Sequence, residues 1–290
     1  MRPLSILLPC YNEQQYIEQT ILSLVEQDYQ DFEVIISDNA STDSTVEKIQ
    51  QIIEGDKRFK LIKQKQNIGA AHNWMFLIEK IETEFAMFLG GHDYLSPNFV
   101  GECLEAIQKN HNISISFGIP LAINEKGDII NFHKFKIYNL SDPSPSARYL
   151  SAAEYLNDAT CVQGIMRSSL LKKFEFAPIS SIDLILISYM LWHGNLHYHP
   201  ETRYYRRIFE KRESSYMERI TGQKNSIRDR YPFFQAYLKN FNSLFNGSEE
   251  LRCQSLDELL RILTRRFGKQ GLKPLGALSR FKMSFWPFKK

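Results

Sequence analysis

Residues 85–97 read Phe-Ala-Met-Phe-Leu-Gly-Gly-His-Asp-Tyr-Leu-Ser-Pro. The apolar run at 85–89 predicts a buried strand, and the two glycines place His92 and Asp93 just beyond its end. In open α/β sheets ligands bind beyond the carboxyl ends of the strands, and glycine lets a charged ligand approach the backbone closely. An imidazole beside a carboxylate can hold Mn²⁺ or Mg²⁺ against a diphosphate, whereas the simpler interpretation of the same residues is an ordinary turn.

Four more apolar runs in the first 118 residues alternate with segments of helical periodicity. The five predicted strands cover residues 4–8, 32–37, 59–63, 85–89 and 113–117. The first helix places Ile17, Ile21 and Leu24 on one face, and the second is predicted to open with a capping box formed by Ser44 and Glu47. This alternation predicts an α/β fold, with a mainly parallel sheet flanked by helices.

The pattern becomes less regular after Phe117. It predicts a strand at 129–137, turns at 141–147, a helix from Ser151, a strand at 162–167 and a helix at 182–193 that ends at Gly194. From Met217 onward the pattern is helical, with a hairpin near Asn246 and Gly247. The chain is therefore expected to carry a C-terminal helical extension.

The composition indicates a folded protein with a sizeable core. Of the 290 residues 43% are hydrophobic and 24% are charged, which excludes a disordered chain, a collagen and a small disulfide-stapled protein. Four widely spaced cysteines form neither a zinc motif nor a redox motif, which favours a reducing compartment. The first apolar run does not resemble a signal peptide, and residues 182–192 are too short to span a bilayer. The cytoplasm is the predicted location.

Polar residues follow each of the first three strands. Tyr11 follows the first strand and Asp38 the second, and the loop from Asn67 to Asn73 opens the third helix. An aromatic ring can stack on a base, a carboxylate can accept the imino N–H of uracil or guanine, and a helix N-terminus can face an anion. Each residue taken singly fits a cap or a turn equally well. Their convergence at one edge of the sheet indicates a nucleoside site.

In order and spacing, these motifs resemble glycosyltransferase family 2. The motifs are Pro9-x-Tyr11-Asn12-Glu13, the turn from Asp38 to Asp43, Asn67-x-Gly69-x-x-x-Asn73, and the strand that ends before Asp93-x-Leu95-x-Pro97. The resemblance is strong over residues 1–120 and continues more weakly through 164–167 and 181–183 to residue 210. It implies a GT-A fold, a nucleotide-diphosphate sugar donor, a divalent metal and inversion at the anomeric carbon.

The resemblance also implies roles for individual residues. The nucleotide-sugar site would comprise Pro9, Tyr11, Glu13, Asp38, Asn67, Gly69, Asp93 and Arg206. His92 and Asp93 would hold the metal, Mn²⁺ or Mg²⁺. Family members typically have a carboxylate at the place of His92, and an imidazole lacks the negative charge that strengthens the binding of hard cations. Many family members also have a histidine shortly after the arginine that corresponds to Arg206. This chain has Ile208 there.

An inverting transfer needs a base that takes the proton from the acceptor hydroxyl. Asp183 lies at the start of an otherwise apolar helix, where the helix dipole favours a carboxylate, and the resemblance places the catalytic carboxylate there. The alternative is that Asp183 only caps the helix. Asp158 and Glu154 are the other candidate bases.

Two further features have competing interpretations. His197 and His199 would point to one face of a strand, but no carboxylate lies at a spacing that favours a metal site.

Residues 265–290 contain eight basic and no acidic residues, interspersed with aromatic ones. Such a tail could lie on an anionic bilayer, or it could form a helix packed on the body with a solvated basic face. No recognised nucleic-acid module accompanies it, so no nucleic-acid partner is expected.

These observations together predict an inverting glycosyltransferase. It would move a sugar from a nucleotide-diphosphate donor to a hydroxyl of a glycan or lipid-linked acceptor in bacterial cell-surface polysaccharide synthesis. Residues 1–118 would bind the donor, 119–210 would shape the acceptor site, and 211–290 would form helices with a basic tail on the inner face of the membrane. The alternatives are a non-catalytic nucleotide-sugar or glycan-binding subunit and a nucleotidyltransferase; for the latter no glycine-rich phosphate loop is found.

Overall fold

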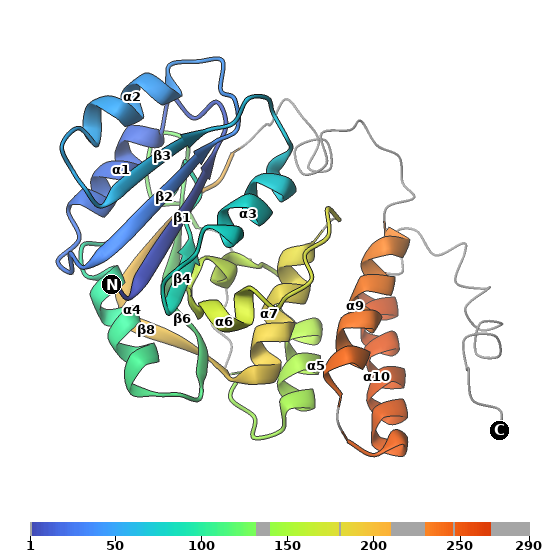
Figure 1. The fold of residues 1–290 in the computed structure, drawn as a ribbon. Helices are drawn as coiled ribbons and strands as arrows, with labels where there is room; N and C mark the ends of the chain where they lie inside the picture. Colours follow the sequence, from blue (N-terminus) through green and yellow to red (C-terminus); the bar gives the residue numbers. More distant parts are fainter. Residues whose placement is uncertain (1, 132–139, 180, 210–229, 246, 268–290) are drawn as a thin grey trace.

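The computed structural model describes residues 2–131, 140–179, 181–209, 230–245 and 247–267. In these residues one eight-stranded sheet has the order β3-β2-β1-β4-β7-β6-β8-β5. Helices pack on the sheet, and a helical pair at the C-terminal end of the described chain lies beside the second half of the fold (Figure 1).

The first half of the sheet is parallel, as predicted. Its strands are β1 (Leu4–Cys10), β2 (Phe32–Asp38), β3 (Phe59–Lys63) and β4 (Phe85–Phe88). The connecting helices are α1 (Ile17–Val25), α2 (Thr45–Ile52) and α3 (Ala70–Glu79). All four residues of β4 are buried, which is expected of a central strand covered on both faces. The polar loops that follow β1, β2 and β4 therefore open at the same edge.

The second half of the sheet mixes strand directions. Its elements are β5 (Tyr94–Leu95), α4 (Phe99–Lys109), β6 (Ile113–Ile123), α5 (Pro145–Tyr155), η1 (Thr160–Gln163), β7 (Ile165–Arg167), α6 (Ser168–Leu171), α7 (Ile182–His193) and β8 (Asn195–Arg207). β7 runs antiparallel to both β4 and β6, and β5 runs antiparallel to β8, whereas β6 and β8 are parallel. The antiparallel β7 joins the two halves into one sheet.

The C-terminal helices are α9 (Arg230–Leu244) and α10 (Glu249–Phe267). The turn between them includes Gly247, as predicted, while Asn246 lies outside the described residues. Of the helices that the structure describes, none combines the length and the apolar character needed to cross a bilayer.

Two predicted helix starts need correction. Ser44 precedes α2, but its side chain makes no capping bond; the N–H of Thr45, the first helical residue, donates to Asp43 Oδ1 at 3.0 Å. The helix expected from Ser151 begins at Pro145, where proline is tolerated in the first turn and Ser144 Oγ accepts the N–H of Ala147.

Two strand boundaries also differ from the prediction. β6 continues to Ile123, and residues 160–163, expected to begin a strand, form the 3₁₀ turn η1. Of the strand expected at 129–137, Ile129 makes one bridge to Ile123, and residues 132–139 lie outside the described residues.

Gly194 ends α7 because of a close approach between two backbone segments. Its φ of −179° is open to any residue. A Cβ atom at this position, however, would lie 2.6 Å from the Asn112 carbonyl oxygen and 2.9 Å from the Ser114 amide nitrogen. Both are backbone atoms of β6 or of the turn before it, so they cannot move aside as a flexible side chain could.

We therefore predict that Gly194→Ala destabilises the protein by about 1–3 kcal/mol through overpacking. The melting temperature should fall by roughly 2–4 °C for each kcal/mol. Gly101→Ala on α4 is the control, since its Cβ would meet only Tyr29 Cβ, at 3.2 Å, and alanine favours a helix. Equal melting temperatures for the two variants would contradict this explanation.

Candidate active site

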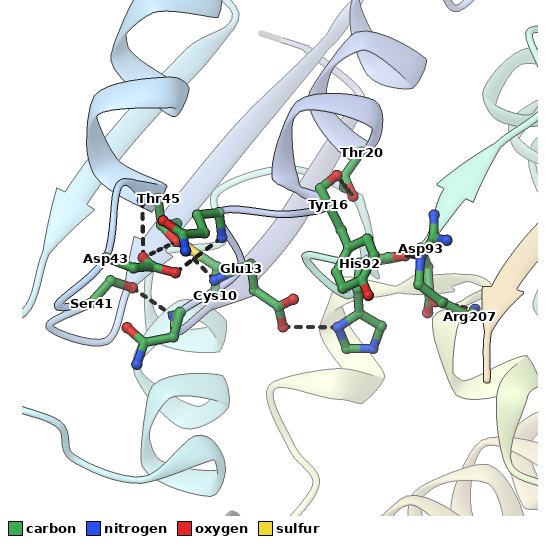
Figure 2. Close-up of polar contacts among 12 residues, drawn as sticks. Cys10, Glu13, Tyr16, Thr20, Ser41, Asp43, Thr45, His92, Asp93 and Arg207 are labelled. Atoms are coloured by element: carbon green, nitrogen blue, oxygen red, sulfur yellow. Dashed lines mark hydrogen bonds and ion pairs between the residues drawn. The ribbon is translucent and has the colours of Figure 1, made fainter. Parts of the chain in front are cut away.

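Hydrogen bonds join the loops that follow β1 and β2. The Asn12 N–H donates to Ser41 Oγ at 2.9 Å, and the Thr42 N–H donates to Asn12 Oδ1 at 2.9 Å. The Glu13 N–H donates to Thr45 Oγ1 at 2.8 Å, so both loops are held to the start of α2 (Figure 2). Asn12 has a φ of 53°, a left-handed conformation that is unfavourable for a non-glycine residue. The hydrogen bonds of this loop stabilise it.

The loop before α3 is held to the same edge. Asn39 Nδ2 donates to Asn67 Oδ1 at 2.9 Å, and Asn39 Oδ1 accepts the N–H of Ile68 at 2.9 Å. Asn67 Oδ1 also accepts the N–H of Gly69, whose φ of 81° favours glycine. The backbone N–H groups of the first turn of α3 follow directly, and no side chain caps them.

The three nucleoside-site candidates nearest the sheet differ in exposure. Tyr11 is 42% exposed, so its ring is available for stacking. Asp38 is buried, and its Oδ2 accepts the N–H of Ser41 at 3.0 Å. Pro9 is half-buried in β1, opposite Ser37 of β2. In this ligand-free geometry, Asp38 shapes the turn, and Tyr11 presents the larger contact surface.

His92 faces Glu13 across the ends of β4 and β1. The His92 Nδ1 atom lies 2.8 Å from Glu13 Oε1, and both side chains keep about a fifth of their surface exposed, 21% and 18% (Figure 2). Gly91 makes this approach possible, because a Cβ there would lie 3.1 Å from Glu13 Cγ and 3.2 Å from Cys10 Cβ. Burial acts to lower the pKa of His92, but the charge of Asp93 and the bond to Glu13 outweigh it, and the pKa is raised.

Asp93 connects β4 to β8 from the interior. It is 4% exposed; its Oδ2 accepts the Tyr204 hydroxyl at 2.8 Å and its Oδ1 accepts the Arg207 N–H at 2.8 Å. The Arg207 side chain returns to the His92 carbonyl oxygen at 3.0 Å. Burial and the negative charge of Asp93 raise the pKa of Tyr204 well above its usual range, so the phenol stays a donor.

The two predicted metal ligands are placed differently. A metal-binding histidine commonly bonds a carboxylate through its second ring nitrogen, and the Glu13 contact gives His92 this arrangement, with Nε2 left for a ligand. Both oxygens of Asp93 already accept buried hydrogen bonds. Within the described residues, no three His, Cys, Asp or Glu side chains are grouped as a metal site. His92 therefore fits a metal better than Asp93 does.

Asp183 lies in the first turn of α7 and is partly exposed. Its Oδ1 accepts the N–H of the next residue, Leu184, at 2.9 Å. Ser181 precedes the helix with a φ of 59° and makes no side-chain cap. Burial raises the pKa of Asp183, while the Leu184 N–H and the charge of Arg206 oppose that shift. A raised pKa suits a carboxylate that must accept a proton near neutral pH.

Arg206 of β8 is near enough to His92 and Asp183 for its positive charge to act on the pKa of both. Its Nη1 donates to Asp158 Oδ1 at 2.6 Å and also contacts Thr160 Oγ1. The guanidinium is thus held by the segment before η1, within electrostatic reach of both groups.

The two other candidate bases have partners in the structure. Asp158 Oδ1 accepts the Thr160 N–H at 2.8 Å in addition to Arg206. Glu154 on α5 forms an ion pair with Arg265. Asp183 forms no ion pair among the described residues, so of the three it is the carboxylate without an ionic partner there.

The histidine pair and the basic tail belong to other parts of the fold. The rings of His197 and His199 are 6.0 Å apart on β8, and His199 Nε2 lies 3.2 Å from Glu102 Oε2 on α4. In the tail, Arg265 and Arg266 contact α5, and residues 268–290 lie outside the described residues.

Two residues of the site have a role that the sequence did not predict. Tyr204 and Arg207 hold Asp93, and Arg207 also bonds Gln19 of α1 at 2.6 Å. The polar and aromatic run at 204–207 was visible as a motif, but its pairing with residues 94–95 depends on the antiparallel β5–β8 register. That register joins segments more than 100 residues apart, so the local sequence pattern does not reveal it.

Comparisons with known proteins agree with this fold. Residues 5–174 match the profile of Glycosyl transferase family 2. An uncharacterized glycosyltransferase of Haemophilus influenzae is 36% identical over 108 residues, which are 37% of this chain and 43% of that protein. The putative teichuronic acid biosynthesis glycosyltransferase TuaG of Bacillus subtilis is 34% identical over 89 residues, or 31% of this chain and 35% of TuaG.

A third sequence relative and a solved structure extend the comparison. A Campylobacter jejuni protein, GalNAc(5)-diNAcBac-PP-undecaprenol beta-1,3-glucosyltransferase, is 33% identical over 96 residues, which are 33% of this chain and 31% of that protein. The chain thus spans less than half the length of these relatives. The crystal structure of S. aureus TarS 1-349 in complex with UDP-GlcNAc has a TM-score of 0.68 at 20% identity, over 96% of this chain and 78% of that 1-349 chain. The fold is that of the GT-A glycosyltransferases, and the chain belongs to glycosyltransferase family 2.

Proposed function

We propose that this protein is an inverting glycosyltransferase that moves a sugar from a nucleotide-diphosphate donor to a hydroxyl of a glycan or lipid-linked acceptor. The observation that carries the proposal is the joining of the loops after β1, β2 and β4: Asn12 bonds Ser41 and Thr42, and Glu13 Oε1 lies 2.8 Å from His92 Nδ1. These contacts bring the nucleoside-site and diphosphate-site candidates to one edge of the sheet, as a nucleotide-sugar donor requires. The relative with a lipid-linked acceptor in its name supports the choice of acceptor class.

The nucleoside would bind over the joined loops after β1, β2 and β3. Tyr11 would stack on the base, and the edge formed by Pro9, Asp38 and Asn67 would contact the base and ribose. The N–H groups at Gly69 and the first turn of α3 would face the anionic part of the donor. The complex of TarS with UDP-GlcNAc is consistent with a nucleotide-sugar donor for this fold.

The diphosphate would lie between His92 and Arg206. A divalent cation, Mn²⁺ or Mg²⁺, would be held by His92 Nε2 and phosphate oxygens, and when bound it supplies charge that stabilises the departing diphosphate. Glu13 keeps the imidazole oriented, and Asp93 keeps the loop fixed to β8. Asp93 would thus support the metal through position more than through direct coordination.

Asp183 would act as the general base. As the acceptor oxygen attacks the anomeric carbon, Asp183 takes the hydroxyl proton, and the bond from the anomeric carbon to the diphosphate breaks on the opposite face. The partial burial that raises the pKa of Asp183 strengthens it as a proton acceptor. The configuration at the anomeric carbon is inverted because there is a single displacement.

A second candidate function is a non-catalytic subunit that binds a nucleotide sugar or a glycan. The residues before Asp93, Gly90-Gly91-His92, favour this function, because they include no carboxylate where family members typically have one for the metal. Turnover by the purified protein distinguishes the two, because such a subunit would bind the donor without consuming it.

The cellular location is proposed on the chemistry of the substrates and the tail. Nucleotide sugars are polar donors, and residues 265–290 are strongly basic and aromatic. A cytoplasmic enzyme held at the inner face of the membrane through this segment would meet a lipid-linked acceptor there. The segment lies mostly outside the described residues, so the membrane contact stays a prediction.

Asp183→Asn should strongly slow transfer while leaving donor binding intact. We expect kcat to fall about 10²–10⁴-fold, the usual contribution of a general base. For the wild-type protein, activity should fall as pH drops through a pKa above 3.8, because the shift of Asp183 is upward and only the ionised carboxylate accepts a proton. Proton NMR of the product should show the inverted anomer.

Glu154→Gln is the matched control, since it removes a carboxylate that pairs with Arg265 instead. It should keep near wild-type kcat. Wild-type turnover by Asp183→Asn would refute the assignment of the base.

The metal role of His92 is tested by calorimetric titration of Mn²⁺ in the presence of UDP or GDP. His92→Ala should weaken Mn²⁺ binding by roughly tenfold or more, as loss of a ligand or its orienting partner usually does. His92→Asp should retain or tighten it, because a carboxylate suits a hard cation. If His92→Ala binds Mn²⁺ as tightly as the wild-type protein does, His92 is not a ligand.

A further inference from the structure

Three buried hydroxyl groups lie between α5, α7 and α9, away from the candidate donor site. They belong to Tyr149, Ser188 and Tyr237, each at most 1% exposed. Figure 1 shows α9 beside α7, on the side of α7 that faces away from strands β1–β3. Buried hydroxyls are costly unless they are paired, so their partners show what the network holds in place.

The network ends on the first turn of α7. Ser188 Oγ donates to the Leu184 carbonyl oxygen at 2.9 Å. The Tyr237 hydroxyl contacts Ser188 Oγ closely and reaches the same Leu184 carbonyl at 3.4 Å. Two hydroxyls, one from the helix itself and one from α9, therefore converge on one backbone carbonyl.

Leu184 is also the residue that orients Asp183. Its N–H donates to Asp183 Oδ1 at 2.9 Å, so Leu184 is bonded at its N–H by Asp183 and at its carbonyl by the hydroxyl network. Asp183 and Tyr237 are close enough for the carboxylate charge to act on the phenol. A displacement of Leu184 would be transmitted directly to the carboxylate.

Other hydrogen bonds also hold α7. The Leu184 N–H donates to the Ser181 carbonyl oxygen at 3.1 Å, and Arg148 of α5 donates to the carbonyl oxygens of Leu191 and Trp192 in the last turn, at 2.7 and 3.0 Å. The Ser188 and Tyr237 hydroxyls add a side-chain link between the first turn of α7 and α9. The Tyr237 ring also packs edge-to-face on Tyr149 and Phe233, a contact that phenylalanine would preserve.

We propose that Tyr237 of the C-terminal helical pair, acting through Ser188 and Leu184, is a positioning residue for the Asp183 carboxylate. The inference rests on the proposed function of Asp183 as the base. It makes α9 a part of the catalytic unit, although α9 lies beyond the residues that match the family profile.

The groups that act on Asp183 come from several elements packed around it. In the described structure they are Arg206 from β8, Asp158 from the segment before η1, Cys161 from η1 and Tyr237 from α9. Removing the Tyr237 hydroxyl leaves all the charges in place. Any change in the pH profile of kcat would therefore report a change in the hydrogen bonding of Asp183, since the Leu184 N–H lowers the pKa of its carboxyl.

The experiment compares Tyr237→Phe and Ser188→Ala with Tyr149→Phe in the full chain. Tyr149 is the matched control: its buried hydroxyl bonds Asn240 Oδ1 at 3.0 Å and the Tyr237 carbonyl at 3.3 Å, both on α9, and neither bond is to α7. Each variant should lower the melting temperature by about 2–4 °C, the usual effect of one buried hydrogen bond in a protein of this size.

The kinetic constants separate positioning from stability. Tyr237→Phe and Ser188→Ala should lower kcat roughly tenfold, less than the hundredfold that an ångström of misplacement can cost. Their acid limb should move to higher pH, with the donor KM unchanged. Tyr149→Phe should keep the wild-type kcat and pH profile.

Two results would overturn the inference: wild-type kcat and pH profile in Tyr237→Phe, or equal loss of kcat in all three variants. Wild-type protein and Asp183→Asn are measured in the same assay. Failure of the proposed function appears separately, as an inactive wild-type protein or an active Asp183→Asn variant.

Discussion

The buried carboxylate of Asp93 is the constraint on which the site depends. It accepts one hydrogen bond from the Tyr204 hydroxyl and one from the Arg207 backbone, and it thereby ties the loop after β4 to β8. A buried carboxylate is tolerated only when its lone pairs are satisfied, so this link tolerates little displacement. It places Arg206, which lies between its two partners in sequence, close to His92.

The remaining parts of the site are positioned by similar means. Among the described residues, the three non-glycine residues with positive φ are Asn12, Ala40 and Ser181. They lie after β1, after β2 and before α7, where candidate donor and base residues are found. Such backbone strain persists only where neighbouring bonds hold it, and it is typical of functional sites. The local strain and the local hydrogen bonds thus point to the same region as the sequence motifs.

The sequence was informative where the signal is local. Apolar runs predicted β1, β2 and β4, because parallel strands buried on both faces are nearly continuously hydrophobic, and Gly194 predicted the end of α7. It was less informative where distant segments decide. The antiparallel insertion of β7, the extension of β6 along β8, and the burial of Asp93 under Tyr204 follow from long-range pairing. The capping box predicted for Ser44 does not form; the N–H at the start of α2 that bonds a side chain is that of Thr45, which donates to Asp43 Oδ1.

The central claim is that one site holds the diphosphate near His92 and Arg206, with Asp183 facing the sugar. A crystal structure of the Asp183→Asn variant with an intact nucleotide-diphosphate sugar would test it most directly. The nucleobase is expected next to Tyr11, and the anomeric carbon of the sugar should face position 183. The diphosphate should lie within hydrogen-bonding distance of Arg206 or be bridged by a cation to His92. A donor bound on another face, or an anomeric carbon turned away from α7, would contradict it.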